Sequence, residues 1–116
     1  MSYDFVVVGS GIAGLYTALL AQHRGSVLIL TKSSLDECNT RYAQGGIAAA
    51  VGRDDSPAIH YRDTMRAGDR LCDARAVRIL AEEASDRILD LVRMGVIFDT
   101  VDGEVALGRE GAHSLP

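Results

Sequence analysis

A glycine-rich stretch between an apolar run and an Ala- and Leu-rich run constrains the fold of this chain more than any other feature. The glycines lie within residues 9–14, directly after the β-branched run 4–8 and directly before residues 15–24. We expect a strand with both faces buried over 4–8, a helix over 15–24 that ends at Gly25, and a second buried strand over 26–31. Strand, helix and strand in this order predict a right-handed βαβ unit.

Each glycine of this stretch has its own role in a dinucleotide-binding turn. Gly9 makes the tight turn out of the strand, Gly11 lets a pyrophosphate approach the backbone, and Gly14 lets the helix pack closely on the sheet. The helix N-terminus offers N–H groups and a partial positive charge to the phosphates. The alternative is a glycine-rich turn in an ordinary α/β sheet. The predicted cofactor-binding turn consists of Gly9, Ser10, Gly11, Ile12, Ala13 and Gly14.

The residue that would bind the ribose of NAD is missing. An acidic residue is usual about twenty positions after the glycines, but the second predicted strand ends in Leu30-Thr31-Lys32. The Thr31 hydroxyl can accept or donate one hydrogen bond, and Lys32 can face a phosphate or the adenosine. The missing acid argues against NAD, whereas Lys32 alone would also suit the 2′-phosphate of NADP.

The rest of the chain is predicted to be mainly helical. Three connecting segments follow the second strand: a loop over 32–46, a small apolar segment over 47–51 and a turn over 52–55. Ser56 before Pro57 predicts a helix start, and this helix should end near Gly68. Asp73 should cap the longest helix, which Gly95 ends.

The longest predicted helix has one apolar face, and a hairpin follows it. Apolar residues recur at helical spacing: Val77, Leu80, Ala81, Ala84, Ile88, Leu91 and Val92. A short strand is expected over 96–98. Asp102-Gly103 is a hairpin turn signal between residues 98–101 and 104–107.

Charge and cysteine usage exclude several classes of protein. The 116 residues carry 12 Lys and Arg against 16 Asp and Glu, a net charge of −4, with no basic stripe for nucleic acid. No apolar run approaches the roughly 20 residues of a membrane span, and the N-terminus lacks the features of a signal peptide. Cys38 and Cys72 show neither metal-ligand spacing nor a disulfide pattern. We expect a reduced, cytoplasmic setting, no nucleic-acid partner and no metal site.

A second motif, residues 39–49, joins a Gly-Gly pair to Gln and small residues. The backbone N–H groups of such a loop can lie against a flat ring system and donate to its polar edge. The segment and its spacing from the glycine turn resemble the flavin-contacting loop of the succinate dehydrogenase and fumarate reductase flavoprotein superfamily. Thr31-Lys32 is also a trait of this superfamily, which explains the missing acid.

The resemblance implies an α/β fold, a Rossmann-like doubly wound FAD-binding domain. The succinate and fumarate enzymes carry a His that bonds covalently to FAD where this chain has Asn39, so the resemblance implies FAD held non-covalently. Tyr42 is expected either near the flavin or in the core. The implied cofactor contacts beyond the glycine turn are Lys32, Asn39, Thr40, Arg41, Tyr42, Ala43, Gln44, Gly45 and Gly46.

Within the superfamily the chain resembles the L-aspartate oxidase branch. The segments that carry this resemblance are residues 42–49, 63–64, 67–68, 72–73, 95–99 and 109–114. The last of them resembles the motif R-E-G-G-H-S, with Ala112 in place of the second glycine. The resemblance implies that Glu110 orients the substrate amino group, for which a carboxylate is the natural partner. It also places His113 near the substrate or the flavin.

The activity implied by this resemblance is oxidation of L-aspartate to iminoaspartate. Hydride leaves the substrate α-carbon for FAD, and oxygen or fumarate accepts the electrons. The product would feed quinolinate and NAD biosynthesis, with quinolinate synthase downstream.

Two alternatives stay open: a fumarate reductase or succinate dehydrogenase type of flavoprotein, and a non-catalytic FAD-binding module. Residues 1–116 are interpreted as the N-terminal part of an FAD-binding domain in an interrupted chain. We expect this chain alone to have no oxidase activity, because the family's catalytic Arg and further substrate-binding residues come later. His23 and His60 are expected on helix surfaces.

Overall fold

The computed structural model describes residues 1–43, 46–109 and 111–116. The chain divides into two compact units, Met1–Gly45 and Gly46–Pro116. The glycine-rich turn belongs to the first unit, and the two longest helices belong to the second.

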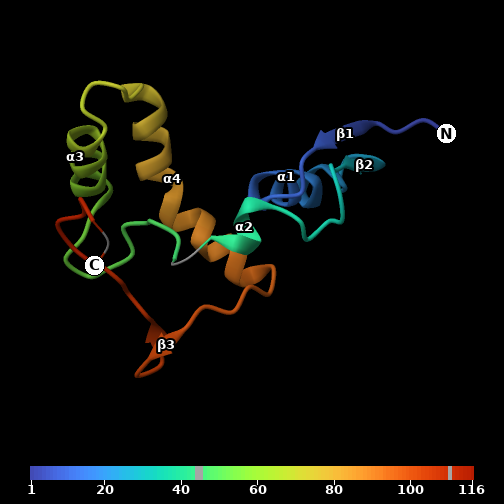
Figure 1. Cartoon of the computed structure of the whole chain (residues 1–116). Coiled ribbons are helices and arrows are strands. Elements are labelled where there is room, and N and C mark those ends of the chain that lie inside the picture. The colour runs from blue at the N-terminus through green and yellow to red at the C-terminus, as the bar shows by residue number, and fades with distance from the viewer. Residues whose placement is uncertain (44–45, 110) are drawn as a thin grey trace. The chain divides into compact units, whose positions relative to one another are not determined.

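The first unit contains the predicted βαβ arrangement. Strand β1 (Phe5–Val8) pairs in parallel with β2 (Val27–Leu30), and helix α1 (Ile12–Ala21) connects them (Figure 1). The register sets Phe5 opposite Val27 and Val8 opposite Leu30. The helix starts at Ile12 rather than Leu15, because the last glycine of the turn already adopts helical geometry. It ends before His23, which lies in a turn rather than on the predicted helix.

The prediction that both strands are buried on two faces is wrong for this chain. Val6 is 55% exposed and Val8 is 80% exposed. The physical reason is that β1 and β2 form a two-stranded sheet, and such a sheet with a single connecting helix cannot cover both of its faces. The parallel pairing is the arrangement that a doubly wound sheet uses, and the full doubly wound sheet stays a prediction.

The segment after β2 was predicted to be a loop throughout, but it contains a short helix. Helix α2 (Asn39–Tyr42) begins after Cys38, whose backbone is extended. Its first turn is closed by the Arg41 N–H, which donates to the Cys38 carbonyl at 3.1 Å. This single helical turn therefore carries four of the implied cofactor contacts: Asn39, Thr40, Arg41 and Tyr42.

The second unit is organised by two helices with the predicted caps. In α3 (Pro57–Ala67), the Ser56 hydroxyl accepts a hydrogen bond from the Ile59 N–H at 3.3 Å. In α4 (Ala74–Arg93), the Asp73 carboxylate accepts one from the Ala76 N–H at 2.8 Å. Both caps satisfy amide groups that have no partner within the helix.

Helices α3 and α4 pack against each other and form the small core of this unit. On α4 the buried apolar residues are Val77, Ala81 and Ile88, whereas Leu80, from the same predicted face, is 54% exposed. The predicted apolar segment 47–51 is neither helix nor strand. It packs on α4 through the buried Ala50, whose carbonyl accepts a hydrogen bond from the Ser85 hydroxyl at 2.9 Å.

A hairpin follows α4, as predicted, but its strands are shorter than expected. Strands β3 (Thr100–Val101) and β4 (Glu104–Val105) pair antiparallel. Asp102 and Gly103 have φ values of +53° and +83°, as a type I′ turn requires. The strand expected over 96–98 does not form, because the segment has no neighbouring strand with which to pair.

Within the described ranges, none of the helices has both the length and the apolar composition needed to cross a bilayer.

Candidate functional site

The turn from β1 to α1 has the backbone geometry that the glycine pattern predicts. Gly9 adopts a φ of +104°, a left-handed conformation that side chains disfavour. Its N–H donates to the Leu30 carbonyl at 2.8 Å, which fixes the turn to the end of β2. A Cβ on Gly14 would overlap the Gly9 carbonyl oxygen. Two of the three glycines are therefore required by the turn itself.

The N-terminus of α1 is open to an anion. The N-cap residue Gly11 has no side chain and so supplies no capping hydrogen bond of its own. The Thr40 hydroxyl accepts a hydrogen bond from the Ile12 N–H at 3.1 Å. A Cβ on Gly11 would point toward the same hydroxyl, at 3.4 Å. Thr40, a residue of the second motif, thus meets the glycine turn at the start of α1.

A part-buried hydrogen bond joins the ends of the two parallel strands. The hydroxyl groups of Ser10 and Thr31 lie 3.1 Å apart, and Ser10 is only 2% exposed. Thr31 therefore bonds to the glycine turn. Lys32, the next residue, is exposed, which leaves its ammonium group available to a phosphate.

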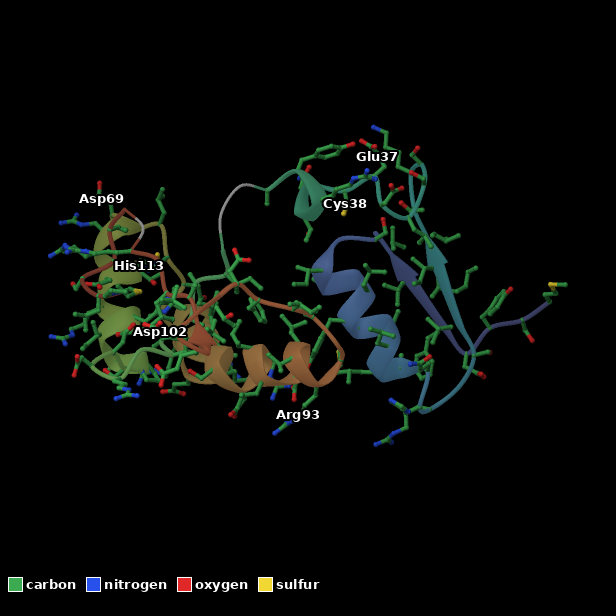
Figure 2. The ribbon with its side chains drawn as sticks, turned by 90° about the horizontal axis from the view of Figure 1, so that it is seen from below. Glu37, Cys38, Asp69, Arg93, Asp102 and His113 are labelled. Carbon is green, nitrogen blue, oxygen red and sulfur yellow. The ribbon has the colours of Figure 1, made fainter. Side chains whose placement is uncertain are left out.

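The other residues of α2 bond within their own segment. Arg41 forms an ion pair with Asp36, and the Tyr42 hydroxyl donates to Glu37 at 2.8 Å. This hydrogen bond to a carboxylate raises the pKa of Tyr42. Tyr42 is 62% exposed, so it is not a core residue of this chain. Figure 2 shows Glu37 and the neighbouring Cys38 in the segment that precedes α2.

The remaining residues of the implied flavin loop are solvent-facing or lie outside the described residues. Asn39, Ala43 and Gly46 are exposed. Gln44 and Gly45 fall outside the described ranges. The described part of the motif provides one clear contact with the glycine turn, through Thr40.

A second group of polar side chains gathers around α3. His60 and Asp63 are buried, and the His60 ring centroid lies 5.1 Å from that of His113. Figure 2 shows His113 beside α3. The prediction that His60 is a surface residue is wrong, because the C-terminal segment covers this face of the helix. Glu110, the predicted substrate-orienting carboxylate, lies outside the described residues.

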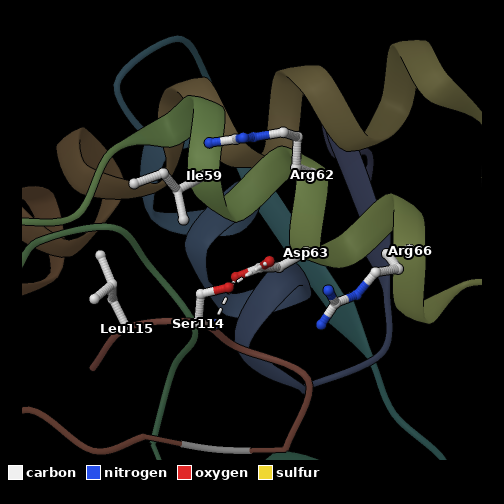
Figure 3. A pocket seen from close by; sticks show the side chains of 6 residues that line it. All are labelled: Ile59, Arg62, Asp63, Arg66, Ser114 and Leu115. Atoms are coloured by element: carbon white, nitrogen blue, oxygen red, sulfur yellow. Dashed lines mark hydrogen bonds between the residues drawn. The ribbon is translucent and has the colours of Figure 1, made fainter.

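Asp63 is a functional candidate that the sequence did not single out. Its carboxylate accepts hydrogen bonds from the Ser114 N–H at 2.6 Å and the Ser114 hydroxyl at 2.8 Å (Figure 3). These bonds, the backbone one foremost, lower the pKa of Asp63. An open pocket of about 490 Å³ lies beside this pair, lined by Ile59, Arg62, Asp63, Arg66, Ser114 and Leu115. A sequence signal existed, because an Asp three residues after His60 shares its helix face.

The cysteines and acidic residues form no metal centre in the part of the chain that the structure describes. Cys38 and Cys72 are both unbridged. The Cys72 thiol donates weakly to the Thr64 carbonyl at 3.7 Å.

The donor set at the glycine turn suits the pyrophosphate of a dinucleotide. The start of α1 offers N–H groups, of which that of Ile12 bonds to the Thr40 hydroxyl, and Gly11 leaves the approach to them free of a Cβ. The residues directly after β2 are Thr31 and Lys32, so the end of this strand lacks the ribose-binding carboxylate typical of NAD sites. These residues fit FAD.

Comparison with known proteins gives the same result. The profile of the FAD binding domain family matches residues 4–116. This chain belongs to the FAD binding domain family, and its cofactor is FAD.

Several similar relatives carry one enzyme name. The chain is 49% identical over 113 residues to "L-aspartate oxidase, chloroplastic" of Arabidopsis thaliana, covering 97% of this chain and 17% of that protein. It is 49% identical over 112 residues to "L-aspartate oxidase" of Streptomyces coelicolor, covering 95% and 19% respectively. The chain therefore spans about a fifth of the length of these relatives.

Solved structures also match the whole chain. "Mycobacterium smegmatis Sdh1 in complex with UQ1" is 40% identical, with a TM-score of 0.92, over 100% of this chain and 20% of that one. The apo form of the same complex matches 98% of this chain with a TM-score of 0.90. At 40% identity, the helices and strands described above are shared with a larger protein.

Proposed function

We propose that this chain supplies the FAD pyrophosphate site of an L-aspartate oxidase, a flavin-dependent oxidoreductase. The observation that carries the cofactor part is the open N-terminus of α1 beside Gly9 and Gly14. The names of the curated relatives support the substrate part. The reaction would convert L-aspartate to iminoaspartate, with the bound flavin supplying the hydride acceptor.

The residues of the first unit have separate roles in holding FAD. The N–H groups at the start of α1 bind the pyrophosphate, because the helix N-terminus carries a partial positive charge. The Thr40 hydroxyl lies within hydrogen-bond distance of the Ile12 N–H, so it can share a phosphate oxygen with it. Exposed Lys32 adds a positive charge. Asn39 carries an amide in place of a nucleophilic imidazole, so FAD is held without a covalent bond.

Two residues near the end of the chain are proposed to bind the substrate. Glu110 pairs with the ammonium group that distinguishes L-aspartate from succinate. His113 contacts a substrate carboxylate or the flavin. Oxygen or fumarate takes up the electrons, the product enters quinolinate and NAD biosynthesis, and the unbridged Cys38 and Cys72 suit a reduced, cytoplasmic setting.

A comparison of two glycine variants tests the cofactor site. In the complete gene product, Gly11→Ala keeps the fold, because its Cβ meets only the Thr40 hydroxyl at 3.4 Å. It should still weaken FAD binding, since the Cβ occupies the approach of the pyrophosphate. Gly108→Ala is the matched control, because a Cβ there meets nothing within 4 Å. Equal FAD affinity in both variants would contradict the proposal that the pyrophosphate binds at this turn.

The second candidate function is that of a succinate dehydrogenase or fumarate reductase type of flavoprotein. The observation in its favour is the 40% identity to Sdh1 over the whole chain. The identity to the proteins named L-aspartate oxidase is higher, at 49%. Turnover of L-aspartate against succinate, measured for wild type and Glu110→Gln, separates the two. We expect Glu110→Gln to impair oxidation of L-aspartate and to leave binding of succinate unchanged.

A non-catalytic FAD-binding module is the third possibility. The 116-residue chain by itself is proposed to lack oxidase activity, because it spans about a fifth of its relatives. Visible flavin absorbance in the purified chain, followed over time with L-aspartate, measures cofactor binding and turnover together. Turnover by this chain alone would overturn the proposal.

A further inference from the structure

Asp63 binds Ser114 with both of its carboxylate oxygens. Oδ2 accepts the Ser114 backbone N–H at 2.6 Å, and Oδ1 accepts the hydroxyl at 2.8 Å (Figure 3). Asp63 is 7% exposed in the middle of α3. A buried carboxylate is costly unless it is paired, and hydrogen bonds to an ionised acceptor are the strong ones. Ser114 is therefore held to α3 through its main chain as well as its side chain.

The residue before Ser114 is held on the same face of α3. The His113 ring lies 5.1 Å from the His60 ring, with the two planes tilted by 51°. His60 and Asp63 are three residues apart on a helix and so share one face. The Arg109 guanidinium donates from Nε to the His113 carbonyl at 3.2 Å, which closes the turn before it. His113 is thus restrained at its ring, at its carbonyl and through the following residue.

We propose that Asp63 is a positioning residue that fixes the imidazole of His113 in the substrate site by clamping Ser114. This inference rests on the proposed function, in which His113 contacts the substrate or the flavin. Asp63 itself touches no reacting group. Its role is to hold residues 111–116, which form neither helix nor strand, as a fixed support for one side chain. The pKa of Asp63 is lowered by the bonds from Ser114, so the acceptor remains ionised at neutral pH.

The test uses the complete gene product with bound FAD and five variants. Asp63→Ala removes both acceptors, whereas Ser114→Ala removes only the hydroxyl bond and keeps the backbone one. His113→Ala removes the positioned side chain, and Asp63→Ala/His113→Ala closes a double-mutant cycle. Asp86→Ala is the matched control, because Asp86 is an exposed carboxylate on α4.

The kinetic expectation is specific to an action through His113. Asp63→Ala should lower kcat/KM for L-aspartate by roughly tenfold, as expected for losing a hydrogen bond to a charged group. FAD content should stay near that of Asp86→Ala at a temperature where both variants are folded, and Ser114→Ala should show a smaller loss of kcat/KM. In the His113→Ala background, Asp63→Ala should cause almost no further loss. A full additional loss in that background would overturn the proposal, and so would loss of bound FAD in Asp63→Ala.

Hydrogen exchange provides a readout that does not depend on activity. Amide exchange of a peptide covering residues 111–116 should be roughly tenfold faster in Asp63→Ala than in Asp86→Ala, because the Ser114 N–H loses its acceptor. Equal exchange in the two variants would overturn the clamp. If wild type does not oxidise L-aspartate but this peptide is protected as expected, the proposed function fails while the clamp itself stands.

Discussion

The Gly14→Ala substitution probes the close approach of helix α1 to the glycine turn. A Cβ at this position would overlap the Gly9 carbonyl oxygen, and it would lie 3.0 Å from the Gly9 carbonyl carbon. These are backbone atoms, so no side-chain rotation relieves the contact. The Gly9 N–H is also bonded to the Leu30 carbonyl at 2.8 Å. Helix α1 must therefore move away from β1, or the turn must open.

The expected loss of stability follows from two opposing effects. Overpacking of this kind costs about 1–3 kcal/mol. Ala gains about 1 kcal/mol over Gly within a helix, which offsets part of it. Because the overlap is with backbone atoms, the upper end of this range applies, and a net loss of up to about 2 kcal/mol in the free energy of unfolding should remain. Displacement of α1 also moves the N–H groups that face the pyrophosphate, and losing one such bond weakens FAD binding about tenfold.

Urea unfolding and FAD titration of three variants measure these effects. Gly14→Ala should lose both stability and FAD affinity. Gly11→Ala should lose FAD affinity alone, because its Cβ makes only a 3.4 Å contact with the Thr40 hydroxyl. Gly108→Ala should lose neither. If Gly14→Ala unfolds at the same urea concentration as Gly108→Ala and binds FAD equally well, the close approach of α1 to the turn is refuted.

Further predictions concern hydrogen bonds and caps. Ser10→Ala should destabilise the fold by about 1 kcal/mol, and Thr31→Val should cost nothing more in that background, because the two hydroxyls bond to each other; urea midpoints of both variants and the double variant check this. Ser56→Ala removes the cap of α3 and should cost about 1 kcal/mol by the same assay. Because hydrogen bonds lower the pKa of Asp63 below its unfolded value, it stabilises the fold above the ordinary carboxyl pKa. This contribution is lost as pH falls through the lowered value. The free energy of unfolding should therefore fall less steeply at acid pH in Asp63→Asn than in wild type, and an equally steep fall in both would contradict the prediction.

The βαβ unit could be predicted because its signals are local. The β-branched runs, the spacing of the glycines and the Ala- and Leu-rich helix each act over a few residues. The caps at Ser56 and Asp73 were predictable for the same reason. What local patterns could not reveal is exposure: Val8 has the composition of a buried strand, but its burial depends on neighbouring strands.

The contacts that define the candidate sites are long-range, and local sequence patterns predict them less well. Thr40 meets Ile12 across 28 residues, and Ser114 meets Asp63 across 51. Thr40 was predicted to contact the cofactor through family resemblance, without its bond to α1. His60 was predicted on a helix surface, whereas in the structure it is buried and its ring lies near that of His113.

Anaerobic addition of L-aspartate to the FAD-loaded complete gene product is the most direct measurement of the proposed activity. The oxidised flavin absorbance should bleach with one L-aspartate consumed per flavin, and it should not bleach with succinate. The Gly11→Ala variant should bind less FAD and bleach in proportion to what it retains. A flavin that stays oxidised in the presence of L-aspartate, or that is reduced by succinate instead, would contradict the assignment.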